Sequence, residues 1–133
     1  MAESDKLVEK TLKIIDYFDC KWCIENPAFS YLWTREVAAR LLEKSVITSY
    51  CVHGYPYRKH TRLANNIPLV LPKCPGKNLC PMMIGGLHIE HAQRGKGGHS
   101  PKDHTRDELH SIPEGLVKKI FKQINVGSTA AQD

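Results

Sequence analysis

Residues 22–27 read WCIENP, an apolar run of strand length that ends in an acid, an amide and a proline. Proline has no N–H group to give to a sheet, so we expect the strand to stop before Pro27 and to deliver Glu25 to its carboxyl end. In an open α/β sheet, ligands gather at the carboxyl ends of the strands. The stretch therefore predicts that Glu25 and Asn26 lie at a binding site, and the structural alternative is an exposed loop acid.

Three amphipathic helices are predicted around this strand. The first spans Ser4–Phe18, where apolar residues recur at helical spacing behind a serine suited to a helix N-terminus. The second is predicted from Thr34 to about Lys44. The third begins with capping-box spacing and a proline in its first turn, spans Ser111–Ile124, and is followed by a frayed tail at residues 127–133.

Short strands are also predicted between the second and third helices. They cover Ile47–Val52, Arg62–Ala64 and Leu69–Leu71. The alternation of helices and strands predicts an α/β fold. Because 133 residues suffice for one domain but not for two, we expect residues 1–126 to form a single α/β domain.

The composition excludes several classes of protein. With 41% hydrophobic and 25% charged residues, the chain is typical of a globular domain and not of a disordered or collagen-like one. No apolar run approaches the roughly 20 residues that span a bilayer, and no signal peptide is visible. Five cysteines, an odd number, fit a reducing compartment better than a disulfide framework. We expect an intracellular protein, cytoplasmic or nuclear, with no membrane partner.

The net charge of +5 is concentrated in the middle of the chain, where residues 50–106 contain nine basic and two acidic residues. Such a block suits a polyanion, because each neutralised phosphate releases counterions. Tyrosines interleave with the basic residues between 55 and 62, as in surfaces that stack on bases. The alternative is a solvated basic hairpin whose tyrosines pack on the core. The predicted nucleic-acid contacts are Tyr57, Arg58, Lys59, Arg62, Arg94 and Lys96.

Residues 73–107 are rich in Cys, His, Gly and Pro and show no periodicity. A segment of this length without regular structure usually needs something besides a core to hold it. Cys74, Cys80 and His88 supply sulfur and nitrogen ligands of the kind zinc takes in a tetrahedral site, and Cys51 is a candidate for the fourth. Two alternatives stay open: buried cysteines that merely neighbour surface histidines, and a catalytic zinc with an open position at His88 or His91.

Taken together, these segments resemble the carboxyl-terminal half of cytosine-5 DNA methyltransferases, in particular divergent viral and mobile-element-like members. Leu7–Asn26 is similar to the helix and strand that lead to the family's Glu-Asn motif. Cys51–Arg62 resembles a later strand with its Gln-x-Arg-x-Arg motif, with Tyr57 at the glutamine and Lys59 and Thr61 at the two arginines. Ser111–Ile124 resembles the closing helix. The resemblance implies a partial Rossmann-like methyltransferase sheet with flanking helices and an irregular, zinc-bound insertion.

The resemblance also implies roles for individual residues. Glu25 would hydrogen-bond ring nitrogen 3 and the exocyclic amine of a cytosine flipped out of DNA, and Asn26 would shape the turn behind it. Lys59 or Arg62 would approach the base carbonyl and the backbone. In the divergent relatives, cysteines and a histidine recur at positions like the four candidate zinc ligands, which favours a structural zinc.

Two parts of the family's machinery have no counterpart in the sequence: the glycine-rich loop for S-adenosylmethionine and the Pro-Cys nucleophile. Without them the isolated chain should not methylate DNA. We expect a fragment or subunit that contributes the glutamate and the basic residues, while a second subunit supplies the nucleophile and the S-adenosylmethionine site. The alternative is a non-catalytic, zinc-stabilised domain that binds nucleic acid or protein.

Overall fold

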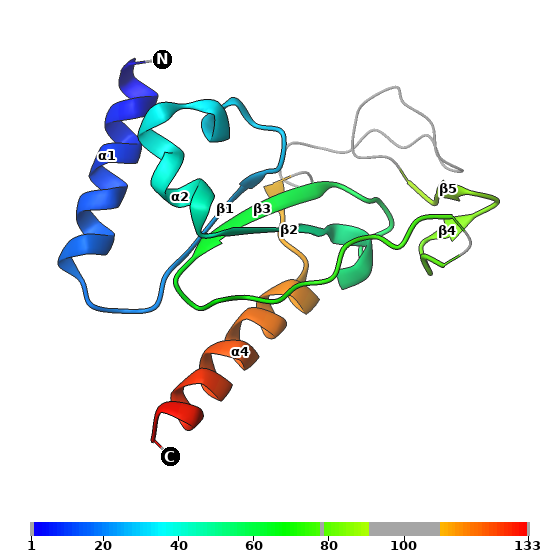
Figure 1. The fold of residues 1–133 in the computed structure, drawn as a ribbon. Coiled ribbons are helices and arrows are strands. Elements are labelled where there is room, and N and C mark those ends of the chain that lie inside the picture. The colour runs from blue at the N-terminus through cyan, green and yellow to red at the C-terminus, as the bar shows by residue number, and fades with distance from the viewer. Residues whose placement is uncertain (1, 78, 91–109, 133) are drawn as a thin grey trace.

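A three-stranded antiparallel sheet lies at the centre of the computed structural model, which describes residues 2–77, 79–90 and 110–132 (Figure 1). Its strands are β1 (Cys23–Pro27), β3 (His60–Asn65) and β2 (Ser45–Ser49), in that spatial order. Because β3 is antiparallel to both neighbours, β1 and β2 run parallel to each other, with β3 inserted between them. Their carboxyl ends therefore lie at the same end of the sheet as the start of β3.

Helices cover both faces of this sheet. Helix α1 (Ala2–Tyr17) and helix α2 (Ala39–Glu43) lie on one face, and helix α4 (Glu114–Gln132) lies on the other (Figure 1). The mixed helix-and-sheet class predicted from the sequence is confirmed. Among the described residues, no helix is long and apolar enough to cross a membrane.

The core divides into two clusters, one on each face, because successive residues of a strand point to opposite sides. Toward α1 and α2, Ala64 of β3 packs with the buried side chains of Trp33 and Leu41. Toward α4, Leu63 packs with Tyr50 and Leu116, both almost fully buried. Amphipathic faces of α1 and α4 complete the two clusters, which is why their periodicity predicted both helices correctly. Helix α4 extends to Gln132 and so includes most of the segment for which a frayed tail is predicted.

The strand at residues 22–27 runs further than its sequence predicts. Main-chain bonds join Ala28 N–H to His60 O and Asn66 N–H to Trp22 O, so even-numbered residues of β1 are hydrogen-bonded to β3. Pro27 occupies a position whose N–H would point away from β3, and its missing donor therefore costs no bond within the sheet. Glu25 accordingly lies inside the strand, opposite Leu63, and not after its end.

The predicted helix from Thr34 to Lys44 is only partly correct. The chain forms two 3₁₀ helices, η1 (Tyr31–Thr34) and η2 (Glu36–Ala38), before the short α2. Arg35 is extended between them and places its Nε 3.0 Å from Asp5 Oδ1 of α1, which fixes the break. The side chain of Trp33, in η1, is buried and donates its indole N–H to Pro27 O at 2.9 Å. Contacts to α1 and β1 thus override the local helical periodicity.

Of two further strand predictions, the first is correct in part and the second is wrong. The strand predicted over Ile47–Val52 is instead β2 over Ser45–Ser49, after which Tyr50–His53 form the 3₁₀ helix η3. Leu69–Leu71 forms no strand, because Val70 bonds a side chain of α4 and not a neighbouring strand: its N–H and C=O contact the amide of Gln123 at 2.8 and 2.9 Å.

A chain of hydrogen bonds ties α4 to the sheet. Lys119 Nζ donates to His53 Nδ1 at 3.0 Å, and His53 Nε2 donates to Thr48 Oγ1 at 2.7 Å. Thr48 in turn donates to Pro72 O at 2.5 Å. Burial, and then the charge of Lys119, lower the pKa of His53 to about 4, so the imidazole is neutral and each bond has one donor and one acceptor. The chain therefore links α4, β2 and the segment after β3.

Gly115 in the first turn of α4 lies against the backbone of η3. An added Cβ there would lie 2.8 Å from His53 O. We predict that Gly115→Ala lowers the free energy of unfolding by about 1–3 kcal/mol, because a backbone atom must move to admit the methyl group. Helix propensity alone would favour alanine by about 1 kcal/mol. Urea unfolding checks the sign, with Lys122→Ala on the exposed side of the same helix as the control.

Candidate metal centre

The four predicted metal ligands come together at the end of the sheet where β1 and β2 terminate. They are Cys51, Cys74, Cys80 and His88. Their ligand atoms all lie within 4.8 Å of one another. Cys51 belongs to η3, and Cys74 and Cys80 lie on the loop that follows Pro72. His88 is in β5 (Leu87–His88), which pairs with β4 (Met83–Ile84) in a small hairpin. The grouping of these four side chains, predicted from the sequence, is confirmed.

Two of the distances between these side chains match the edges of a tetrahedral zinc site. His88 Nε2 is 3.5 Å from Cys74 Sγ and 3.7 Å from Cys80 Sγ. Bond lengths of about 2.3 Å to sulfur and about 2.0 Å to nitrogen give a tetrahedral edge of about 3.6 Å. Three cysteines and one histidine are a usual structural set for zinc. Because the protein supplies four ligands, the arrangement does not resemble a catalytic site, which keeps one position for water or substrate.

The electrostatics of the cluster also fit a cation. Burial raises the pKa of the Cys51 thiol well above its ordinary value, and the neighbouring thiols of Cys74 and Cys80 raise it further. Three thiolates cannot share this volume unless a positive charge compensates them. A divalent metal would supply that charge and bind as the protons leave.

Glycines shape the loop that carries three of the ligands. Gly76 has a positive φ of 87°, and its carbonyl accepts the N–H of Cys80 at 3.2 Å. Gly85 and Gly86, both with positive φ, form the two-residue turn between β4 and β5. The absence of periodicity in this segment predicts no regular structure, and the hairpin departs from that expectation. A Gly-Gly pair flanked by apolar residues is the signal that could have predicted it.

Ser49, at the end of β2, contacts the backbone of one candidate ligand, Cys74. This fully buried hydroxyl accepts the N–H of Cys74 at 3.0 Å and lies 2.9 Å from His60 Nδ1. It therefore fixes the backbone of one ligand to the sheet.

Glu25 is a second candidate site residue, and its partner Tyr50 directly precedes the candidate ligand Cys51 in the chain. Its Oε1 accepts hydrogen bonds from the hydroxyls of Thr61 and Tyr50, the latter at 3.3 Å. Lys59 Nζ lies 5.1 Å from the centre of the Tyr50 ring. Burial lowers the pKa of Lys59, while the charge of Glu25 opposes this shift. The pairing of β1 with β3 thus places the carboxylate next to residues of the basic segment.

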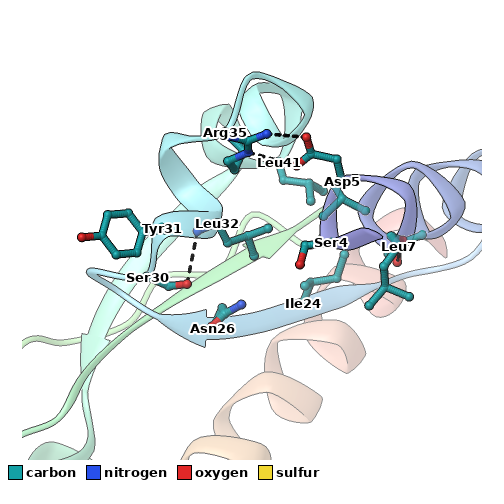
Figure 2. A pocket seen from close by; sticks show the side chains of 12 residues that line it. Ser4, Asp5, Leu7, Ile24, Asn26, Ser30, Tyr31, Leu32, Arg35 and Leu41 are labelled. Atoms are coloured by element: carbon teal, nitrogen blue, oxygen red, sulfur yellow. Dashed lines mark hydrogen bonds and ion pairs between the residues drawn. The ribbon is translucent and has the colours of Figure 1, made fainter. Parts of the chain in front are cut away.

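Asn26 and Arg62 lie on the opposite face of the sheet from Glu25. Asn26 lines a pocket of about 440 Å³ between α1, β1 and η1 (Figure 2). The Arg62 guanidinium lies 5.8 Å from the Trp33 ring and donates to Ser45 Oγ at 2.9 Å. Strand alternation therefore separates Glu25 from Asn26, although they are adjacent in sequence.

The remaining predicted nucleic-acid contacts differ in exposure. Tyr57 is only 4% exposed and packs against Tyr50 and Tyr55, as the alternative of tyrosines packed on the core requires. Arg58 is exposed to solvent. Arg94 and Lys96 lie outside the described residues.

No family model, curated protein or solved structure matches this chain. The geometry of the metal centre and of the Glu25 site is therefore the basis for assigning a function.

We predict that the purified protein holds one zinc ion per chain, and that Cys80→Ser and His88→Ala each lose it. Loss of the metal should cost about 3 kcal/mol or more of stability, which lowers the melting temperature by about 10 °C in a domain of this size. Elemental analysis and melting curves with and without a chelator test this. Cys20→Ser, which alters an exposed cysteine outside the cluster, is the matched control. Metal-free protein with an unchanged melting curve would contradict the assignment.

Ser49→Ala should weaken zinc binding without removing a ligand. Loss of a partner that holds a ligand in place typically costs about 10-fold to 100-fold in metal affinity. Competition with a chromophoric chelator measures the affinity. Thr11→Ala, which removes a hydroxyl bonded to Leu7 O within α1, is the control. Equal affinities in the two variants would show that Ser49 has no role in the centre.

Proposed function

We propose that this chain is the base-recognising part of a cytosine-5 DNA methyltransferase-like enzyme. It contributes Glu25 as the contact to an unpaired cytosine and basic residues as contacts to DNA. The observation that carries the proposal is the pairing of β1 with β3, which brings Glu25 into contact with Thr61 in the basic segment, residues 50–106. Another polypeptide chain, or another part of a longer one, supplies the nucleophile and the S-adenosylmethionine site.

The surroundings of Glu25 support a role in reading a base. Among the described residues, both hydrogen bonds to the carboxylate end on Oε1, which leaves Oε2 for a ligand. A carboxylate oxygen is a suitable acceptor for the exocyclic amine of cytosine. Thr61, at the position that the resemblance gives to the second arginine, contacts Glu25 directly.

Positive charge lies close to this carboxylate. Lys59 is half-buried and its charge interacts with that of Glu25, and Arg58 and Lys73 are exposed near His60 at the start of β3. Cations spread in this way suit phosphates on either side of an unpaired base. The structural zinc proposed at the neighbouring cysteines would hold this end of the sheet in place.

The fold is consistent with a piece of a larger, doubly covered sheet of the Rossmann type. Strands β1 and β2 are parallel and joined by a helical crossover, and helices cover both faces. Within the described part of the chain, β1 is an edge, and the N–H and C=O groups of Cys23 and Glu25 point away from β3. A second subunit would continue the sheet along this edge.

A second candidate function is a non-catalytic, zinc-stabilised domain that binds nucleic acid or protein. Two observations favour it. The four candidate ligands would leave no open position on a tetrahedral metal, and Tyr57 is buried at the position where the resemblance places a glutamine. In that case Glu25 would have no preference among bases.

We predict that the protein binds a duplex with one unpaired cytosine more tightly than the same duplex with an unpaired thymine. A good polar contact to a base edge gives about 1–3 kcal/mol of discrimination. Glu25→Ala should abolish the preference while leaving the salt dependence unchanged, because the phosphate contacts remain. Thr61 keeps Asn26 O as an acceptor at 3.1 Å in this variant. Fluorescence anisotropy with labelled duplexes measures both quantities.

Glu36→Ala, which removes a carboxylate from η2, is the matched control. Equal affinities of the wild-type protein for the two duplexes would support the non-catalytic alternative. No binding to either duplex would exclude both of the nucleic-acid functions.

A further inference from the structure

Phe29 and Tyr31, on the turn that leaves β1, are two of the most exposed aromatic residues in the described part of the chain. Their exposed fractions are 86% and 81%. In Figure 2 the Tyr31 ring points outward, away from the side of the pocket formed by α1. Two large exposed rings on one short turn beside β1 supply apolar surface that a ligand could cover.

The turn places these rings at the end of the sheet where the metal centre lies. Ala28 N–H donates to His60 O at 3.1 Å, which joins the end of β1 to the start of β3. The Phe29 ring meets the His60 ring edge-on, with centroids 6.3 Å apart. The rings therefore lie only a few residues beyond Glu25 in the chain, beside the first residue of β3.

Positive charge lies near His60, the residue whose ring Phe29 contacts. Burial lowers the pKa of His60, and the nearby cations Arg58 and Lys73 lower it further. Both cations are exposed to solvent. A surface that combines exposed aromatic rings with cations is complementary to a ligand with flat faces and negative charge.

We infer that Phe29 and Tyr31 stack on unpaired bases of a single-stranded nucleic acid whose phosphates contact Arg58 and Lys73. Bases in an intact duplex cannot reach the rings, because their faces are covered by neighbouring base pairs. The inference rests on the proposed function, since a base read by Glu25 has to be unpaired. It assigns the stacking role to two residues that the sequence did not single out, in place of the buried Tyr57.

The test compares binding of a labelled oligothymidine strand and of the corresponding intact duplex. Phe29→Ala and Tyr31→Ala should each weaken binding to the single strand by about 5-fold to 100-fold, as expected for the loss of one stacked base. Binding to the intact duplex should change little. Phe29→Trp should keep the affinity, because it keeps an aromatic face.

Matched variants separate stacking on bases from a general effect of lost apolar surface. Phe121→Ala removes an aromatic ring that is 61% exposed on α4, and it should have no effect. Phe29→Leu keeps an apolar side chain of similar size, and should weaken binding as much as Phe29→Ala does. Arg58→Ala should reduce the slope of log affinity against log salt by about 1, whereas the aromatic variants should leave that slope unchanged.

The outcomes distinguish this inference from the proposed function. Loss of oligothymidine binding in Phe29→Ala without any cytosine preference in the duplex experiment would support the stacking surface and exclude base reading by Glu25. Full binding by Phe29→Leu, or by the Phe29→Ala Tyr31→Ala double variant, would overturn the inference. Failure of the wild-type protein to bind the single strand would overturn it as well.

Discussion

The insertion of β3 between β1 and β2 is the constraint on which the rest of the structure depends. Its register sets Leu63 opposite both Glu25 and Val46, so one strand fixes both neighbours. The alternation of its side chains then divides the core into an α4 side and a side facing α1 and α2. The same alternation places Glu25 beside Thr61 and turns Asn26 toward the pocket on the other face. Changing the register by one residue would exchange these faces and separate every pair described above.

The candidate metal centre and the turn with the exposed Phe29 lie at the same end of the sheet, because the two parallel strands β1 and β2 both end there. Cys51 follows β2, and the turn with Phe29 follows β1. Ser49 joins the metal centre to the sheet by accepting the N–H of Cys74, and Tyr50 joins it to the carboxylate by donating to Glu25. A metal bound at the four ligands would therefore fix the same short segment that carries the contacts of Glu25. This arrangement explains how an irregular loop could help to position the contacts of Glu25.

Polar side chains replace regular secondary structure where the chain leaves the sheet. The bonds from Lys119 through His53 and Thr48 to Pro72 hold three segments that are distant in sequence. Because each donor has an acceptor, the chain of bonds avoids the cost of leaving the buried polar groups of His53 and Thr48 unpaired. The amide of Gln123 does the same for the backbone of Val70. These contacts make α4 part of the sheet's support as well as a cover for its apolar face.

The sequence by itself determined the long helices, the central parts of β1 and β3 and the four residues of the metal centre. Helical periodicity and apolar strand runs are local patterns, and Cys and His are rarely grouped without reason in a segment that lacks a core. Only the tertiary structure decided the break at Arg35, the loss of a strand at Val70, the burial of Tyr57 and the opposite orientations of Glu25 and Asn26. It also decided that Phe29 and Tyr31 are exposed beside cations from another part of the chain. The break at Arg35, the loss of the strand at Val70 and the burial of Tyr57 each depend on a contact between residues far apart in sequence, which a local pattern does not specify. The orientations of Glu25 and Asn26 follow from strand alternation once pairing with β3 holds both residues in β1.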